Sequence, residues 1–369
     1  MTFVGCDLHT RMQQVAVLDT GTGEVSEHRL PHEGTAVEEF YAAVPRPVTV
    51  GIESTGYAVW FHTLLQRLGH TLLVGDAAKI RAMVVRKTKT DRRDALHILD
   101  LLHHDRRPAI WVPDPATRDL RALLTHRMRL VRIRTMVKNG LQAIALNSRL
   151  ACGSKLLRQA GVAQLQALAL PPHTARRRDQ SLELLAGLTT QIRELDDAIT
   201  TAALGHPDAP RLITHPGVGA LTALTTIVVL GPVRRFHDRK HGVSDVGLAP
   251  ARHASADKYH LGRITKQGSP LLRFVLGQAA AHAARRDPDL KRTSGALVHR
   301  RGRPKAKVAV ARKLLVRLFI MLRDRIDYDE FRRRGRAALA AAYGGRGRTR
   351  SSHGTCSSAG VLGVMHGLS

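Results

Sequence analysis

Four carboxylates in the first hundred residues have the types and positions that phosphate chemistry requires. Asp7 and Glu53 lie in short apolar segments that read as strands. Asp91 and Asp94 stand three residues apart at the start of an expected helix, so both project from one face. Hard divalent cations such as Mg²⁺ prefer several oxygen ligands, and four carboxylates would neutralise the two ions of two-metal phosphoryl transfer. We therefore treat these acids as a candidate metal site.

Each acid also has an ordinary explanation. An aspartate in the first turn of a helix is common because the helix dipole favours negative charge there, and Thr90 is a good N-cap for the helix that begins at Asp91. An acid inside a strand is harder to explain, since burying it without a partner is costly. Taken as a set, the four acids favour a site, and Asp76 and Asp100 are weaker candidates for the same role.

The composition indicates a polyanionic partner. The chain has 369 residues, a formal charge of +28 and a pI near 11.3. Such a field attracts nucleic acid, and the sequence has no aromatic-rich amphipathic helix that would favour a membrane surface instead. A protein that is basic only because its genome favours arginine remains an alternative.

The sequence also indicates a cellular compartment. The three cysteines are widely spaced and match neither a metal motif nor a disulfide framework, which suggests a reducing environment. The N-terminus opens directly into a strand, and no apolar run approaches a membrane span. We expect a cytoplasmic, nucleoid-associated protein without a membrane segment.

Residues 1–112 have the pattern of an α/β domain. Short segments of strand periodicity alternate with helical ones and are separated by turn signals. The resulting order, β-β-β-α-β-α-β-α, is the RNase H-like arrangement, in which the acids of the first and fourth strands lie side by side. The expected strands are Val4–Asp7, Gln14–Asp19, Glu24–Leu30, the segment ending at Glu53, and His70–Val74; the expected helices are Thr35–Val44, Trp60–Leu68 and one that begins at Asp91.

The rest of the chain is expected to be mostly helical. Apolar residues recur at helical spacing in 113–205 with arginines between them, which predicts a helical pair or coiled-coil arm that connects or dimerises. Residues 206–335 predict a further, mostly helical domain with glycine-rich turns. Residues 336–369 are basic and rich in serine and glycine, so we expect a disordered tail.

A glycine-rich turn is a candidate phosphate contact. Gly217 and Gly219 lie between His215-Pro216 and an apolar helix, as in a helix-hairpin-helix element. Glycines at such a turn let backbone amides approach a phosphate, which positions DNA without reading its sequence. An ordinary tight turn between helices explains the same residues, and both interpretations stay open.

A serine lies among cations further along the chain. Ser255 is a candidate nucleophile with His253 as a base, and neighbouring cations would stabilise charge developing on a phosphate. Residue types alone support this weakly, because a loop serine is usually only a turn residue. The cations expected to contact nucleic acid here are Arg252, Lys258, Arg263, Lys266 and Arg273.

In this order and spacing, the three motifs resemble the DEDD-type insertion-sequence transposases, the one-hundred-and-ten family of insertion sequences. The resemblance covers about residues 2–330. Its pieces are Val4-Gly5-Cys6-Asp7-Leu8-His9, Gly51-Ile52-Glu53-Ser54-Thr55-Gly56, Lys89-Thr90-Asp91-Arg92-Arg93-Asp94-Ala95, Pro216-Gly217-Val218-Gly219, Gly247-Leu248-Ala249-Pro250, Gly262-Arg263-Ile264-Thr265-Lys266-Gln267-Gly268 and the helix Lys307 to Arg317.

The resemblance implies a RuvC-like domain of RNase H fold, a coiled-coil arm and a C-terminal transposase domain. It implies Mg²⁺ bound by the four acids and Ser255 as the nucleophile that joins covalently to a DNA phosphate. It also implies a homo-oligomer, dimeric or tetrameric, whose sites combine the acidic domain of one subunit with the serine domain of another. A guide RNA encoded beside the gene would pair with donor and target DNA.

The serine motif departs from the family. Members often have Ser-Ser-Gly-Gly or Ser-Gly where this chain has Ala254-Ser255-Ala256-Asp257, and Thr265 replaces a common serine. Ser244 and Ser269 are fallback candidates for the nucleophile.

The sequence therefore predicts a DNA transposase or recombinase, with two alternatives left open. One is a RuvC-like, Mg²⁺-dependent, structure-selective nuclease that uses water as its nucleophile. The other is a basic nucleic-acid-binding protein that has lost catalysis.

Overall fold

The computed structural model describes residues 1–84, 90–150, 153, 155–255 and 258–344. The chain divides into two compact units, Met1–Asp114 and Pro115–Ser369. The division lies two residues from the boundary expected at 112.

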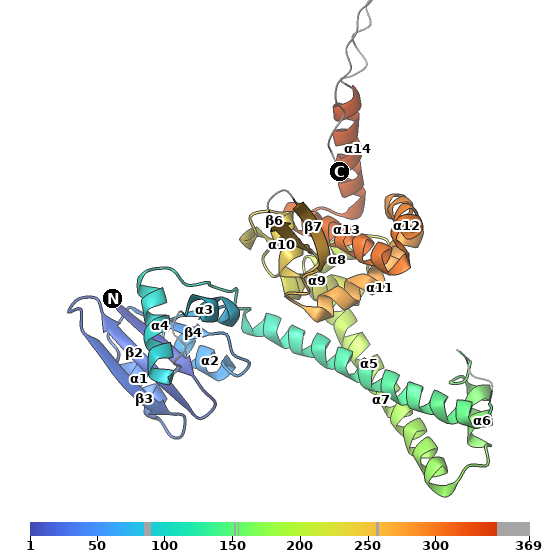
Figure 1. The fold of residues 1–369 in the computed structure, drawn as a ribbon, viewed down its shortest axis with the longest axis horizontal. Coiled ribbons are helices and arrows are strands. Elements are labelled where there is room, and N and C mark those ends of the chain that lie inside the picture. Colours follow the sequence, from blue (N-terminus) through green and yellow to red (C-terminus); the bar gives the residue numbers. More distant parts are fainter. Residues whose placement is uncertain (85–89, 151–152, 154, 256–257, 345–369) are drawn as a thin grey trace, which may run out of the picture. The chain divides into compact units, whose positions relative to one another are not determined.

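The first unit is a five-stranded mixed sheet with helices on both faces (Figure 1). The strand order is β3-β2-β1-β4-β5, with β2 antiparallel to β1 and β3, and with β4 parallel to β1 and β5. The predicted element order is confirmed, with one additional short helix, α3. The elements are β1 Thr2–Leu8, β2 Met12–Asp19, β3 Val25–Pro31, α1 Ala36–Ala43, β4 Val48–Glu53, α2 Val59–Arg67, β5 Thr71–Gly75, α3 Ala77–Met83 and α4 Asp91–His103.

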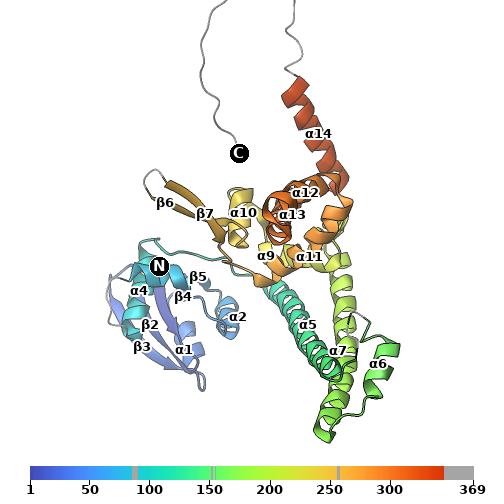
Figure 2. The ribbon, with the colours of Figure 1, turned by 45° about the vertical axis from the view of Figure 1, so that its right-hand side comes forward.

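The two faces of this sheet are covered differently. On one face, Val4, Cys6 and Ile52 pack in a core with Tyr41 of α1 and Phe61 of α2. Because side chains alternate along a strand, the intervening residues face the other way, where α4 contacts β1, β2 and β4 (Figure 2). This second face is the one that bears the candidate acids.

The second unit is built from helices and one hairpin. Its elements are α5 Pro115–Asn147, α6 Gln159–Gln166, α7 Pro172–Gly205, α8 Ala209–Ile213, α9 Ala220–Leu230, η1 Val233–Arg235, α10 Arg239–Asp245, β6 Pro250–Ser255, β7 Lys258–Ile264, α11 Pro270–Arg286, α12 Pro288–Arg301, α13 Arg303–Asp324 and α14 Tyr328–Gly344. The mostly helical character is as predicted.

The predicted arm is present as the long helices α5 and α7, which lie side by side with α6 near one end (Figure 1). Arg178 of α7 fastens α6, since its Nη1 donates to the carbonyls of Leu165, Gln166 and Leu168 at 3.2, 2.9 and 3.3 Å. At the other end, Leu124 and Ile199 belong to the same buried core as helices α8 to α13. The arm and the C-terminal helices therefore form one compact unit rather than two.

The C-terminal helix corrects one expectation. Residues 336–344 were predicted to begin a disordered tail, but α14 continues through them to Gly344. Runs of alanine with arginine and leucine have high helix propensity, which outweighs the nearby glycines. The remainder of the predicted tail, 345–369, lies outside the described residues. Within the described ranges, no helix combines the length and the apolar character needed to cross a membrane.

Candidate active site

The register of β1 and β4 places Asp7 and Glu53 on one face of the sheet. The strands are parallel, with Gly5 opposite Gly51 and Cys6 opposite Ile52. Asp7 and Glu53 each follow their glycine by two residues, so both share the face of the glycines. Both acids are half-buried. The first and fourth strands are neighbours, as expected, and the placing of the two carboxylates side by side stays a prediction.

Two glycines allow α4 to approach this face closely. A Cβ on Gly5 would lie 2.2 Å from the carbonyl oxygen of Ala95 and 2.5 Å from the amide nitrogen of Leu99. A Cβ on Gly51 would lie 2.6 Å from Leu102 Cδ1. At Gly5 the helix backbone itself rests on the sheet, and at Gly51 the side chain of Leu102 occupies the space that a methyl group would need.

The direction of α4 brings its first turn to the acids. Leu99 lies over Gly5 of β1, and the ring of His103 contacts that of Phe3, near the start of the strand. The helix therefore runs antiparallel to β1, and its N-terminus lies at the Asp7 end. Thr90 is the N-cap, as predicted, and its hydroxyl accepts a hydrogen bond from Arg93 N at 3.4 Å.

A histidine links the strand acid to the helix acid. His9 Nε2 lies 3.1 Å from Asp7 Oδ2 and 3.4 Å from Asp91 Oδ1. The Asp7 side chain is 15% exposed and that of Asp91 is 52% exposed, so the cluster opens to solvent on the helix side. Asp94 is half-buried one turn further along α4.

Asp7, His9 and Asp91 offer potential metal-ligand atoms that all lie within 4.8 Å of one another. A divalent cation fits this donor set of two carboxylates and one imidazole. Sequence reasoning missed His9 as a site residue. The available signal was its position two residues after Asp7, immediately beyond the end of β1 at Leu8.

The two weaker acidic candidates have other roles. The Asp76 side chain caps α3 and accepts hydrogen bonds from Ala78 N and Lys79 N. Asp100 pairs with Arg106 at 2.8 Å and with His104 at 3.0 Å. Local helix capping and surface ion pairing account for both residues.

Ser255 is the last residue of β6, opposite Lys258 in the hairpin register, rather than a residue of an irregular loop. Residues 256 and 257, which complete the predicted serine motif, lie outside the described residues. The side chains of 252–259 are likewise not described, so the predicted contacts of Arg252, His253 and Lys258 stay predictions.

The base of this hairpin is locked to the helical core. A Cβ on Gly247 would lie 1.9 Å from Gln267 O, and one on Gly268 would lie 1.8 Å from Asp245 O. Both glycines have positive φ, +75° and +86°, which other residues rarely adopt. The segments that flank the hairpin therefore cross in direct backbone contact.

Arg273 adds to this lock. Its Nη1 donates to the carbonyls of Val246, Gln267 and Gly268 at 2.9, 3.2 and 3.1 Å. The predicted contact of Arg273 with nucleic acid stays a prediction, but its guanidinium has a structural role. Arg263 and Lys266 are exposed at the end of β7 and just after it.

The Pro216–Gly219 turn connects α8 and α9, as expected for either interpretation of it. Gly217 has φ +86°, and a Cβ there would lie 2.4 Å from Ala283 N of α11. Its lack of a side chain thus serves packing against α11. A Cβ on Gly219 would meet nothing within 4 Å, so the structure offers no packing reason for that glycine.

A buried polar network lies next to this turn. Arg317 pairs with Asp287 at 2.6 Å, and the hydroxyl of Tyr328 donates to the same carboxylate. His215 is 1% exposed, and its ring packs against that of Tyr328 in a tilted arrangement with centroids 4.5 Å apart. Burial, and to a lesser degree the nearby Arg317 charge, lowers the pKa of His215 to about 4, although its bond to Pro216 O opposes the shift.

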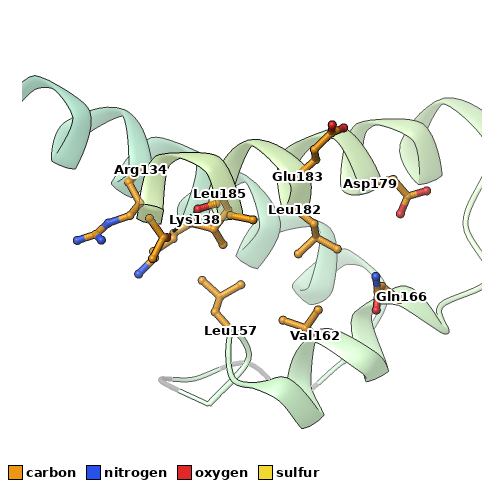
Figure 3. Close-up of a pocket in the computed structure, with 11 residues that line it drawn as sticks. Arg134, Lys138, Leu157, Val162, Gln166, Asp179, Leu182, Glu183 and Leu185 are labelled. Atoms are coloured by element: carbon orange, nitrogen blue, oxygen red, sulfur yellow. Dashed lines mark hydrogen bonds between the residues drawn. The ribbon is translucent and has the colours of Figure 1, made fainter. Parts of the chain in front are cut away.

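The arm contains a cavity of about 770 Å³ (Figure 3). Its lining combines apolar side chains, such as Leu182 and Leu185, with Arg134 and Lys138 on one side and Asp179 and Glu183 on the other. None of the site residues predicted from sequence lines it, so it is separate from the candidate active site.

Comparison with known proteins identifies relatives over both units. Residues 209–294 match the family described as "Transposase IS116/IS110/IS902 family", and residues 4–148 match a DEDD transposase domain of the same group. Together the two matches cover more than half of the chain. The first match contains Ser255, and the second contains all four predicted acids and His9.

Several curated relatives are insertion-sequence transposases. The chain is 28% identical over 237 residues to the transposase for insertion sequence element IS1111A of Coxiella burnetii, covering 62% of this chain and 65% of the relative. It is 27% identical over 252 residues to the transposase for IS1328 of Yersinia enterocolitica, covering 66% and 72%. It is 25% identical over 291 residues to a probable family 20 transposase of Pseudomonas aeruginosa, covering 76% and 84%.

Proposed function

Because the chain belongs to the IS116/IS110/IS902 transposase family, we propose that it cuts and rejoins DNA as the transposase of an insertion sequence. The observation that carries the proposal is the convergence of Asp7, His9 and Asp91 within one cluster, on the face where the register also aligns Glu53. The proposed catalytic residues are Asp7, Glu53, Asp91, Asp94 and Ser255.

The four acids would hold Mg²⁺, and the cluster fits a divalent cation by its donor atoms and spacing. Bound there, Mg²⁺ would polarise a phosphate oxygen and offset charge in phosphoryl transfer. The protein's contribution is to hold the carboxylates in place. Packing of α4 on Gly5 and Gly51 fixes the helix acids relative to the strand acids.

His9 has a positioning role in this proposal. Its imidazole contacts both Asp7 and Asp91, and so it sets the separation of the two carboxylates. An imidazole next to metal-binding carboxylates can serve as a ligand or orient one. Either role requires His9 to stay in contact with both acids.

Ser255 is the proposed nucleophile. Its Oγ would attack the scissile phosphorus and lose its proton to a base, while the bond from phosphorus to the leaving DNA oxygen breaks and that oxygen gains a proton. The resulting phosphoserine linkage preserves the bond energy, and attack by a DNA hydroxyl on that linkage would reverse the step and rejoin the strand.

We further propose a homo-oligomer, a dimer or a tetramer, and a guide RNA as partners in addition to element-end and target DNA. The charge of +28 supports contact with more phosphate than one duplex site presents.

A second candidate function is a metal-dependent nuclease that uses water as its nucleophile. The observation that favours it is that Asp7, His9 and Asp91 belong to one unit and come together without any residue of the other. In that case Ser255 takes no part in the chemistry.

The experiment that tests the proposal is a cleavage assay with labelled element-end DNA, Mg²⁺ and RNA transcribed from the flanking sequence. Wild type should give Mg²⁺-dependent strand cleavage and joining, and Asp7→Asn should give neither. Cleaved but unjoined DNA from both wild type and Ser255→Ala would support the nuclease. Joined product from Ser255→Ala would remove the serine from the mechanism. Binding without any product from wild type would indicate a protein that has lost catalysis.

A further inference from the structure

The junction of α12 and α13 concentrates positive charge on the second unit. Gly302 alone separates Arg301, the last residue of α12, from Arg303, the first of α13. The sequence from Leu290 to Arg323 contains no aspartate or glutamate. Neither helix therefore offers an acid near the junction that could neutralise its cations.

Four cations flank this junction. Arg300, Arg301, Arg303 and Lys305 are all exposed. Within the described ranges none of the four has a hydrogen bond or ion pair. Arg333 and Arg334, two other exposed arginines of the unit, instead both pair with Glu330, at 2.6 and 2.7 Å. We call these four residues the junction cations.

Helix electrostatics explain only half of the junction cations. Arg300 and Arg301 lie in the last turn of α12, where positive charge stabilises the helix dipole. Arg303 and Lys305 lie in the first turn of α13, where positive charge is unfavourable. That turn has no acid, and Gly302 supplies no side-chain cap. The two cations at the start of α13 therefore lower the stability of that helix, and residues that do so are expected at functional sites, such as binding surfaces.

We propose that the junction cations form a contact surface for the sugar-phosphate backbone of duplex DNA. The inference rests on the proposed function, because it assigns to the transposase a surface that holds its DNA substrate. Contacts to phosphates fix the register and orientation of a protein on DNA without reading sequence. They would add to the candidate contacts near Ser255.

Aromatic content favours a duplex over a single strand. Proteins that bind single-stranded nucleic acid stack its bases on exposed aromatic side chains. In α12 and α13 the only phenylalanine, tyrosine or tryptophan is Phe319, which is 2% exposed. The surface therefore offers charge but no stacking platform, which suits a backbone presented by paired strands.

The test measures equilibrium binding of the full chain to a labelled mixed-sequence DNA duplex across a range of salt concentrations. The variant replaces Arg300, Arg301, Arg303 and Lys305 by glutamine. Each lost phosphate contact lowers the steepness of log K against log salt by about 0.9, so we expect a decrease of about 3 to 4. The affinity at physiological salt should fall by about 100-fold or more.

A matched control removes the same charge elsewhere. Arg67, Arg106, Arg333 and Arg334 are exposed but ion-paired, and replacing all four by glutamine should leave the salt slope near wild type. Equal slope changes in both quadruple variants would overturn the proposal, because net charge alone would then explain the effect. The proposal would also be overturned if the variant of the junction cations lost binding to single-stranded RNA but bound duplex DNA as wild type does.

A double variant separates binding from folding. Arg303→Gln with Lys305→Gln removes only the two cations that oppose the α13 dipole. Its thermal unfolding midpoint should equal or exceed that of wild type while its salt slope falls by about 1 to 2. An unchanged slope would contradict the surface. If wild type itself binds no duplex, the proposed function fails first, so the two failures are distinguishable.

Discussion

Asp7 lies between a sheet and a helix that pack against each other, whereas Ser255 ends one strand of a two-stranded hairpin. The acidic cluster draws residues from β1, α4 and the segment after β1, all fixed by close packing at Gly5 and Gly51. The hairpin is fixed at its base, where Gly247 and Gly268 cross, and Ser255 lies at its opposite end. The packing of the first unit thus holds the acids in place, whereas Ser255 lies at the end of a hairpin that is fixed to the second unit only at its base.

The largest effect on DNA cleavage should follow from replacing Asp7, which lies in the acidic cluster of the first unit. Asp7→Asn keeps the shape of the side chain but removes a charge that the proposed metal requires. We expect strand cleavage to fall by at least about 100-fold in single-turnover assays. Asp76→Asn, which alters only the cap of α3, is the control and should retain cleavage. Comparable activity in both variants would exclude the Asp7 cluster as the site.

Close packing of α4 predicts a large loss of stability from a single methyl group. Gly5→Ala would place its Cβ 2.2 Å from Ala95 O, so the helix must move away from the sheet. We expect about 3 kcal/mol of destabilisation in denaturant unfolding, and displaced helix acids. Gly56→Ala meets nothing within 4 Å and serves as the control within the same unit. Equal stabilities would show that α4 does not rest on the sheet as described.

The second unit should be the more sensitive to acid. The pKa of His215 is lowered from 6.5 to about 4, mainly by burial, so below pH 6.5 the unfolded chain binds a proton that the folded chain does not. The free energy of unfolding is therefore unaffected by the titration of His215 above pH 6.5. As the pH falls from 6.5 towards 4, protonation of His215 in the unfolded chain lowers it progressively, by up to about 3 kcal/mol. Denaturant unfolding of wild type and His215→Gln across this range would test it. A pH dependence that persists in the variant would contradict the assignment.

The smallest predicted effect concerns His9. His9→Ala leaves every proposed acid in place but removes the group that contacts both Asp7 and Asp91. We expect the Mg²⁺ concentration required for half-maximal cleavage to rise by about 10-fold. His104→Ala, in an exposed histidine–aspartate pair of the same unit, should leave this value unchanged. An unchanged Mg²⁺ requirement in His9→Ala would remove His9 from the site.

The first unit could be predicted closely from sequence because its signals are local. Alternating strand patterns, turn residues and the Thr90 cap fixed the element order and the start of α4. Asp7 and Glu53 were recognisable because a carboxylate inside an apolar strand is costly to bury without a partner. Contacts between residues far apart in the sequence could not be predicted in this way. Gly5 and Gly51 resemble any strand glycine until α4 is seen above them, and His9 gains meaning only when Asp91 lies next to it.

The second unit was harder to predict because its signals are distributed. The arm helices were evident from periodicity, but their shared core with α8 to α13 depends on long-range contacts such as those of Leu124 and Ile199. The β6–β7 hairpin is short and rich in small and polar residues, so its strands carried no clear alternation. Residue types alone supported Ser255 only weakly, and its role as the nucleophile was implied mainly by the resemblance.

The most direct test of the central claim asks whether DNA becomes covalently attached to the protein. Purified chain is incubated with Mg²⁺, flanking-sequence RNA and labelled element-end DNA, and the products are resolved on a denaturing gel. We predict a protein–DNA adduct for wild type and none for Ser255→Ala or Asp7→Asn, because the reaction needs both the serine and the acids. An adduct that persists in Ser255→Ala, or cleaved DNA without any adduct in wild type, would contradict the account.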